Sequence, residues 1–373
     1  MKHNPKNPHW ANRDRFILSG GHGSTMLYSL LHLFGSGLTL DDLKSFRQDG
    51  SLTPGHPEYG HTLGVEATTD PLGAGMATAV GMAIAEAHLA AIFNRSNYPI
   101  VDHYTLVLGG DGCMMEGISS EAFSLAGTLG LLKLIVLYDS NKISIEGSTD
   151  IAFREDVAAR MRAFGFQTLD VADGNDLDAI ARAIEEAKSD SKRPSFITVH
   201  TTIGYGCPAK QGTAAAHGEP LGEENVRELK RTLGRHNVES PFDVPQDVYD
   251  HYAALARQGV IAEAAWNEMF VEYAKEFPEL KKLWEQYHAP IDAEVLMADE
   301  AYWAYADKPQ ATRNLSEIFL PKIDSDAICT SACASSQWRR LPTALRCTAA
   351  CGCTCRHSSS SAITSNRWCG RRR

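Results

Sequence analysis

The hydrophobic pattern of this chain alternates short apolar runs with longer segments of helical spacing. Tyr104–Leu108 and Leu134–Tyr138 are mainly apolar runs of strand length, and Ile118–Leu129 between them carries apolar residues at helical spacing. Two buried strands joined by a helix are typical of the repeating unit of a parallel sheet. The sequence therefore predicts a strand, a turn, a helix and a second strand over this stretch.

The same alternation continues on both sides of this unit. The further predicted helices are Thr25–Phe34, Leu40–Phe46 with Thr39 as its N-cap, Pro71–Asn94, Arg154–Phe164 and Asp178–Lys188. The further predicted strands are Phe166–Asp170 and Phe196–Val199. We therefore expect an α/β fold with a doubly wound parallel sheet and helices on both faces.

The pattern changes twice along the chain, which predicts three parts. Residues 1–221 hold the alternating strands and helices, and residues 222–326 form a helical extension and linker, including Asp247–Ala256 and Ala262–Lys275. From about residue 327 no periodicity remains, acidic residues are absent, and serine, cysteine and arginine dominate. We expect this tail to be disordered.

Composition narrows the class of protein. The net charge of −10 combines an acidic body with the basic tail, and an acidic body argues against nucleic acid as a partner. Cys113 and Cys207 are the two cysteines of the body, which suits a reduced, cytoplasmic enzyme. No signal-peptide pattern opens the chain, and we expect no apolar run to reach the length needed to span a membrane.

Polar residues follow the two strands of the central unit. The first strand is followed by Gly110-Asp111-Gly112, and the second by Asn141. Because open α/β sheets bind ligands at the carboxyl ends of their strands, we expect both side chains at one site. Their oxygens suit Mg²⁺ or Ca²⁺, and the glycines allow close approach to a phosphate. A Gly-Asp-Gly tripeptide alone is more often an ordinary turn. Neither a P-loop nor a convincing GxGxxG is present.

Five motifs, taken together, resemble transketolases. They are Gly110–Gly117, Asp139–Ser144, Ser19–Ser24, Pro54–Glu58 and Ala216–Gly222. The resemblance runs in order from about Lys2 to about Ser316 and concerns the family's N-terminal, diphosphate-binding region. Deoxyxylulose-phosphate synthase is the nearest alternative among thiamine enzymes, but the motifs Pro54–Glu58 and His217–Gly222 fit transketolase better.

The resemblance implies a cofactor, a metal and a reaction. The cofactor is thiamine diphosphate, and the reaction transfers a two-carbon ketol group from a ketose phosphate to an aldose phosphate. Asp111, Asn141 and the backbone carbonyl of Ile143 are the implied ligands of Mg²⁺ or Ca²⁺. The backbone of Gly112 is implied to donate to a phosphate oxygen. Residues 1–221 then form the diphosphate and metal binding domain.

The resemblance also implies roles for histidines and a loop. His22 and His217 match cofactor contacts, His217 also faces the substrate, and His56 binds substrate and steers its protons. These three are the candidate catalytic residues. The implied cofactor-binding residues are His22, Asp70, Pro71, Leu72, Gly112, Asn141 and His217. Glu116 and Glu121 match acids near the interface of the family's homodimer, although both also suit a solvated helix face.

Several departures from the family pattern bear on activity. Gly20 stands where transketolases commonly carry Asn, Asp70 where they carry Gly, and Ser140 where they carry Asp. Met1 begins inside the family pattern, and we find no pyrimidine-binding domain, whose Glu assists proton removal from the cofactor. We therefore expect an N-terminally truncated, inactive fragment. The alternatives are the N-terminal subunit of a split enzyme with a complementing pyrimidine-binding chain, or a non-catalytic dimerising protein.

The tail admits two interpretations. Cys347, Cys351, Cys353 and Cys355 could bind zinc, but they lack the second separated pair of a usual structural site. Alternatively, the tail is an out-of-frame translation. Codons for Met-His-Phe-Gly-Val-Arg-Glu and for Leu-His-Gly-Gly-Leu-Arg, both similar to the pyrimidine-binding domain, give Cys329–Ser335 and Cys347–Gly352 when read one base later. We favour the second interpretation.

Overall fold

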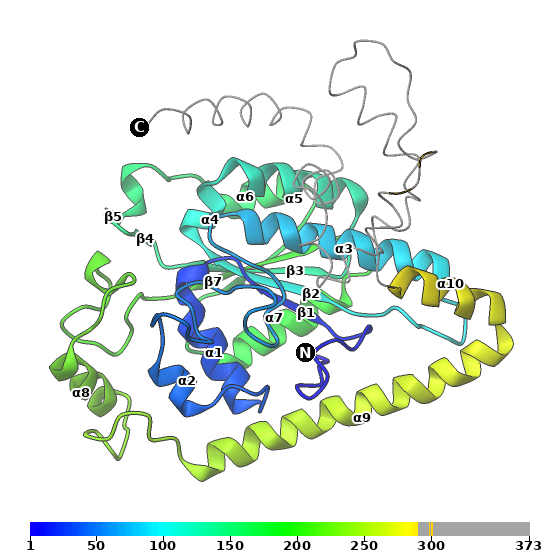
Figure 1. Ribbon diagram of the computed structural model, residues 1–373. Helices are drawn as coiled ribbons and strands as arrows, with labels where there is room; N and C mark the ends of the chain where they lie inside the picture. The colour runs from blue at the N-terminus through cyan, green and yellow to red at the C-terminus, as the bar shows by residue number, and fades with distance from the viewer. Residues whose placement is uncertain (290–297, 299, 301–373) are drawn as a thin grey trace.

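A five-stranded parallel sheet forms the centre of the computed structural model, which describes residues 1–289, 298 and 300 (Figure 1). The strand order is β1-β2-β3-β7-β6. Their bounds are β1 Arg15–Leu18, β2 Thr105–Gly110, β3 Leu134–Ser140, β6 Gln167–Val171 and β7 Ser195–His200. The predicted parallel sheet is confirmed. Strand β1 was not predicted, because its short apolar run follows the polar residues Arg13 and Asp14.

Helices cover both faces of the sheet. One face carries α3 (Ala74–Phe93), α5 (Gly117–Leu129) and α6 (Val157–Ala163), and the other carries α1 (Ser24–Leu33) and α7 (Leu177–Ser189). Both faces of the sheet carry apolar side chains that need covering, as strand β2 illustrates, because alternate side chains of a strand point to opposite faces. Val107 packs in the core under α3 and α5, whereas Leu106 packs in the core beside α7. The doubly wound arrangement is therefore confirmed.

Shorter elements complete the body around the carboxyl ends of the strands. The helices are α2 Leu40–Lys44, α4 Asp111–Met115 and the 3₁₀ turns Gly21–Gly23, Thr149–Ile151 and Ala214–Ala216. A small antiparallel pair joins β4 (Ile143–Ser144) to β5 (Gly147–Ser148). Thr39 caps α2 as predicted, because its side chain accepts a hydrogen bond from the backbone of Asp42.

Helix α3 packs on the sheet beside α5. It begins at Ala74 rather than at the predicted Pro71, because Gly73 adopts the left-handed conformation at its N-cap. Among the described helices, α3 alone is long and apolar enough to cross a membrane, so our expectation that no run has this length was wrong. Its packing explains the composition: a helix that is apolar all round is a core helix when the sheet and another helix cover it.

The helical extension packs against the end of α3. Helix α9 (Gln246–Glu276) is one helix of 31 residues, about 46 Å long, where the sequence predicted two. Gly259 lies inside it because the N-terminal segment crosses there: a Cβ at Gly259 would lie 1.7 Å from the backbone oxygen of His3. Helix α10 (Pro278–His288) then turns back, so that Tyr273 and Trp284 pack on Phe93.

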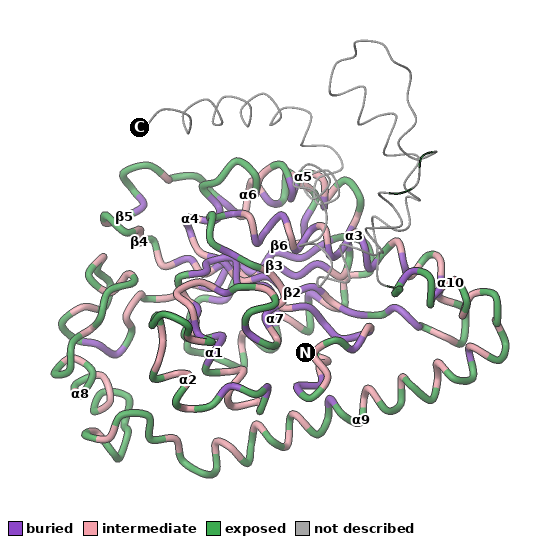
Figure 2. Tube along the Cα trace, viewed as in Figure 1, coloured by how far each residue is buried: buried purple, intermediate pink, exposed green. Residues whose placement is uncertain are grey.

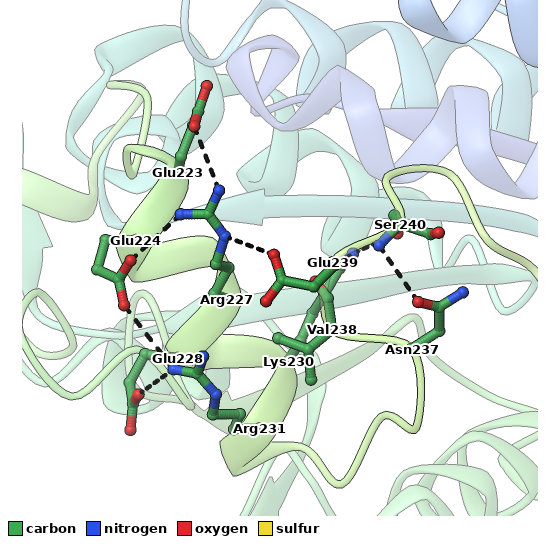
Figure 3. A network of polar contacts seen from close by, with 10 residues as sticks. All are labelled: Glu223, Glu224, Arg227, Glu228, Lys230, Arg231, Asn237, Val238, Glu239 and Ser240. Atoms are coloured by element: carbon green, nitrogen blue, oxygen red, sulfur yellow. Dashed lines mark hydrogen bonds and ion pairs between the residues drawn. The ribbon is translucent and has the colours of Figure 1, made fainter.

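Helix α8 (Glu223–Thr232) contrasts with these elements because it buries none of its residues (Figure 2). Figure 3 shows its ion pairs, in which Arg227 bridges Glu223, Glu224 and Glu239. Exposed pairs of this kind contribute little stability. Helix α8, which follows the predicted His217 motif, is therefore only weakly anchored to the rest of the described chain.

Some predictions concern residues beyond those described. The tail at residues 327–373, with the candidate zinc cysteines Cys347, Cys351, Cys353 and Cys355, lies outside the described residues. Most of the linker after residue 289 also lies outside them.

Candidate functional site

The carboxyl ends of β2 and β3 bring Asp111 and Asn141 to the same edge of the sheet. Strand β2 ends at Gly110, which pairs in register with Asp139 of β3. Asp111 is the first residue of α4 and Asn141 directly follows β3. The predicted elements therefore place both side chains where ligands bind in open α/β sheets.

The carboxylate of Asp111 is buried, with 4% of its surface exposed. Its Oδ1 accepts a hydrogen bond from the Tyr138 hydroxyl at 2.5 Å, and its Oδ2 accepts one from the backbone N–H of Lys142 at 2.9 Å. Lys142 has a φ of +61°, a left-handed conformation that an L-residue seldom adopts. Within the described part of the chain, no lysine or arginine forms an ion pair with Asp111. A buried carboxylate is thus held without a cationic side chain.

Asn141 belongs to a second set of hydrogen bonds. Its Oδ1 accepts from the backbone N–H of Ile143 at 2.9 Å, and its Nδ2 donates to Oδ2 of Asp139 at 3.3 Å. The hydroxyl of Thr201, just after β7, donates to the other oxygen of Asp139. Burial raises the pKa of Asp139, and the nearby charge of Asp111 adds to this shift.

Sequence reasoning assigned no role to the residues that support this site, Tyr138, Asp139 and Thr201. The available signal was their position: Tyr138 and Asp139 lie near the carboxyl end of an otherwise apolar strand, at the edge of the sheet where ligands bind. Thr201 offered no signal, since only the pairing of β3 with β7 brings it close.

This donor set fits a divalent cation. Carboxylate, amide and carbonyl oxygens are hard ligands that suit Mg²⁺ and Ca²⁺. A cation would offset the buried charge of Asp111 and the half-buried charge of Asp139 at adjacent strand ends. No group of three His, Cys, Asp or Glu side chains forms a metal site among the described residues. Of the predicted ligands Asp111, Asn141 and the Ile143 carbonyl, only Asp111 is one of these four residue types. The absence of such a group therefore does not argue against the predicted ligands.

The predicted loop at Asp70, Pro71 and Leu72 lies against α4. A Cβ at Gly112 would come within 3.0 Å of Cδ1 of Leu72. One residue further on, a Cβ at Gly73 would lie 2.8 Å from Cβ of Glu116. The backbone N–H of Gly112 lies in the first turn of α4, where N–H groups lack intrahelical acceptors and are free to bind a ligand.

The three predicted histidines gather in one cluster. The rings of His22 and His217 stack with centroids 4.7 Å apart and planes inclined by 27°. His56 lies next to the same loop, because a Cβ at Gly21 would be 3.0 Å from its ring. Its Nδ1 lies 3.5 Å from Oδ1 of Asp70. The departure at Asp70 therefore gives His56 an acidic neighbour.

His22 sits in an environment that disfavours its protonated form. Burial lowers the pKa of His22, and the neighbouring His217, His56 and Arg47 lower it further when they carry positive charge. The imidazole is consequently neutral near pH 7, so one ring nitrogen accepts a hydrogen bond and the other donates one.

The histidine cluster adjoins the strand-end site. Both lie at the carboxyl edge of the sheet, since His22 follows β1 and Asp111 follows β2. A hydrogen bond from the Ser19 hydroxyl to Sγ of Cys113, 3.3 Å long, joins the loop after β1 to α4. The predicted acids Glu116 and Glu121 are both exposed.

Comparisons with known proteins agree with this geometry. A family model described as transketolase, thiamine diphosphate binding domain, matches residues 1–290. The chain is 56% identical over 281 residues to a transketolase of Geobacillus stearothermophilus, covering 75% of this chain and 42% of that protein. It is 53% identical over 281 residues to a transketolase of Bacillus subtilis, with the same coverage. The chain thus spans less than half the length of these relatives.

Solved structures give the same result. A transketolase from Leishmania mexicana superposes with a TM-score of 0.78 at 46% identity, over 86% of this chain and 47% of that one. A Pichia stipitis transketolase in complex with sedoheptulose 7-phosphate superposes with a TM-score of 0.79 at 45% identity, over 87% of this chain and 48% of that one.

Proposed function

Since this chain belongs to the transketolase family and matches its thiamine diphosphate binding domain, we propose that residues 1–221 bind thiamine diphosphate together with a divalent cation. The observation that carries this proposal is Asp111, a buried carboxylate with no cationic partner among the described residues, beside Asn141. Mg²⁺ is the favoured ion, with Ca²⁺ as the alternative, because both take oxygen ligands.

Different residues of the chain bind the cation, the diphosphate and the rest of the cofactor in this proposal. Asp111, Asn141 and the Ile143 carbonyl hold the cation, the Gly112 N–H donates to a phosphate oxygen, and the loop at Asp70, Pro71 and Leu72 borders the cofactor. When bound, thiamine diphosphate supplies the carbanion chemistry that protein side chains lack. Neutral His22 contacts the cofactor beside the stacked ring of His217.

The proposed reaction of the whole protein is transfer of a two-carbon ketol group from a ketose phosphate to an aldose phosphate. His217 faces the substrate, and His56 binds it and moves its protons, assisted by the nearby carboxylate of Asp70. The sugar phosphate in the Pichia stipitis complex supports this class of substrate. We place the reaction in the cytoplasm and in the pentose phosphate pathway.

We also propose a homodimer as the working assembly. Leu72 and Ile118 are each 37% exposed and Met115 is 40% exposed, next to the exposed Glu116. A second copy of the chain would cover these apolar side chains. Sedimentation of the purified chain as a monomer at high micromolar concentration would contradict this assignment.

Calorimetric titration of thiamine diphosphate with Mg²⁺ into the purified chain tests the cofactor proposal. We expect saturable binding that the Asp111→Ala substitution abolishes. The matched control is Glu186→Ala, which removes an exposed carboxylate of α7 and should leave binding unchanged. Absence of binding by the unsubstituted chain would overturn the proposal. In the same preparation we expect no ketol transfer by the isolated chain, and complementation by a pyrimidine-binding chain would restore it.

A further inference from the structure

The last residues of β3 contact both proposed metal ligands. Tyr138 donates to Asp111, and Asp139 accepts from Asn141. These two contacts come from adjacent residues of one strand, whose side chains alternate in direction. One short stretch of β3 therefore reaches the two ligands separately.

The Tyr138 hydroxyl is held in place by the packing of its ring. The side chain is 4% exposed, and its ring lies 5.6 Å from that of Phe196 in the core. With the ring fixed, the hydroxyl constrains Oδ1 of Asp111 while the Lys142 N–H constrains Oδ2. Each oxygen of the carboxylate thus accepts one hydrogen bond, and each oxygen keeps a further lone pair for a cation.

The Asn141 amide is oriented by a second chain of contacts. Thr201 donates to one oxygen of Asp139, and the other oxygen accepts from Nδ2 of Asn141. Fixing the amide nitrogen also fixes the direction of the amide oxygen on the opposite side. Without the Thr201 hydroxyl, Asp139 would lose the contact that anchors it to the end of β7.

We propose that Tyr138 and Asp139 are positioning residues that set the geometry of the divalent-cation site through Asp111 and Asn141, with Thr201 anchoring Asp139. The inference rests on the proposed cofactor function. Outer groups that orient metal ligands change metal affinity about 10- to 100-fold when they are removed, because the ligands then spend less time in the binding geometry.

The test is the Mg²⁺ concentration that half-saturates thiamine diphosphate binding, measured by calorimetry across a series of Mg²⁺ concentrations. Tyr138→Phe keeps the buried ring and removes the hydroxyl, and Thr201→Val keeps the side-chain shape and removes the other donor. We expect each to raise the half-saturating Mg²⁺ concentration, by about 10- to 100-fold for Tyr138→Phe. Excess Mg²⁺ should restore the cofactor affinity to within about twofold of the unsubstituted chain.

The matched control is Tyr98→Phe, which removes a hydroxyl that donates to Glu276 at 2.8 Å, beyond the C-terminal end of α3. It should leave the Mg²⁺ requirement unchanged. An unchanged Mg²⁺ requirement in both site variants would overturn the inference, as would a loss of binding that excess Mg²⁺ fails to restore, which indicates general damage. Failure of the unsubstituted chain to bind would instead overturn the proposed function, and this inference with it.

Discussion

His22 lies in the histidine cluster, and its surroundings lower its pKa. Its ring stacks on His217, and burial together with the charges of His217, His56 and Arg47 lowers its pKa. The sequence indicated that His22 and His217 share a site only through the resemblance. Their contact depends on the loop after β1 meeting the loop after the 3₁₀ turn Ala214–Ala216.

Replacing His217 with Phe tests this electrostatic coupling. The substitution keeps an aromatic ring against His22 but removes a group that becomes positive. We expect the pKa of His22 to rise while remaining below its ordinary value, because burial, the larger cause, persists. NMR titration of the imidazole resonances measures this. The exposed His236→Phe should have no effect, and an unchanged pKa of His22 in His217→Phe would contradict the coupling.

Two glycines of α5 give a matched test of packing. A Cβ at Gly127 would lie 1.7 Å from the backbone oxygen of Phe164, whereas a Cβ at Gly117 would meet nothing within 4 Å. We expect Gly127→Ala to lower the free energy of unfolding by about 1–3 kcal/mol, because the backbone must move. Gly117→Ala should change it slightly or raise it by about 0.4–1 kcal/mol. Urea unfolding compares them, and equal effects would contradict this packing.

At the scale of elements, α9 and α10 act as a brace across the molecule. Figure 1 shows α9 running along one side to α10, which lies at the C-terminal end of α3. Tyr273 donates to the backbone oxygen of Phe93 at 2.9 Å, and the Trp266 indole donates to the backbone oxygen of Ile100. Aromatic packing and buried hydrogen bonds thus fasten the brace at one end.

Trp284→Ala should loosen this end of the brace. Trp284 is 8% exposed and packs on Phe93 and Phe270, so truncation removes a large buried surface. We expect a loss of about 3–5 kcal/mol in the stability of the α9–α10 unit. Hydrogen exchange measures it: amides of α9 should exchange faster while those of β2 and β3 stay protected. Val271→Ala, at a position of α9 that is 53% exposed, is the control.

If β2 and β3 lost protection together with α9 in Trp284→Ala, the brace and the sheet would be one cooperative unit. That outcome would contradict the view that the helical extension docks on an independently stable sheet.

At the scale of the whole molecule, burial lowers the pKa of four histidines among the residues that the structure describes: His3, His22, His103 and His288. A lowered pKa in the folded state means that the unfolded chain binds more protons once the pH falls below about 6.5. Stability contributed by these neutral imidazoles is therefore present above that pH and is lost as the pH falls below it. His103 should contribute most, because it is 2% exposed and four cationic side chains add to the shift.

We expect the free energy of unfolding to fall between pH 7 and pH 5, with each such histidine contributing up to about 1.4 kcal/mol per pH unit below its unfolded pKa. His103→Leu should reduce this slope, whereas the exposed His236→Leu should not. Urea unfolding at a series of pH values measures both slopes. An equal slope in His103→Leu and the unsubstituted chain would contradict the assignment.

The sequence by itself determined the strands that alternate with helices, their parallel arrangement, and the presence of Asp111 and Asn141 after two neighbouring strands. These follow from local patterns, because side-chain period and turn residues act over a few positions. The resemblance added the cofactor class, and the family comparison agrees with it. The hydrophobic pattern of the sequence did not predict β1, because its apolar run is too short to indicate a strand.

Only the tertiary structure decided what surrounds those residues. The N-terminal segment crosses α9 closely at Gly259, and the hydrogen bond between Tyr138 and Asp111 depends on the register of β2 with β3. The stacking of His22 on His217 brings together residues from near the beginning and near the end of the segment 1–221. Such contacts are made between segments far apart in the chain, so no local pattern of residues encodes them.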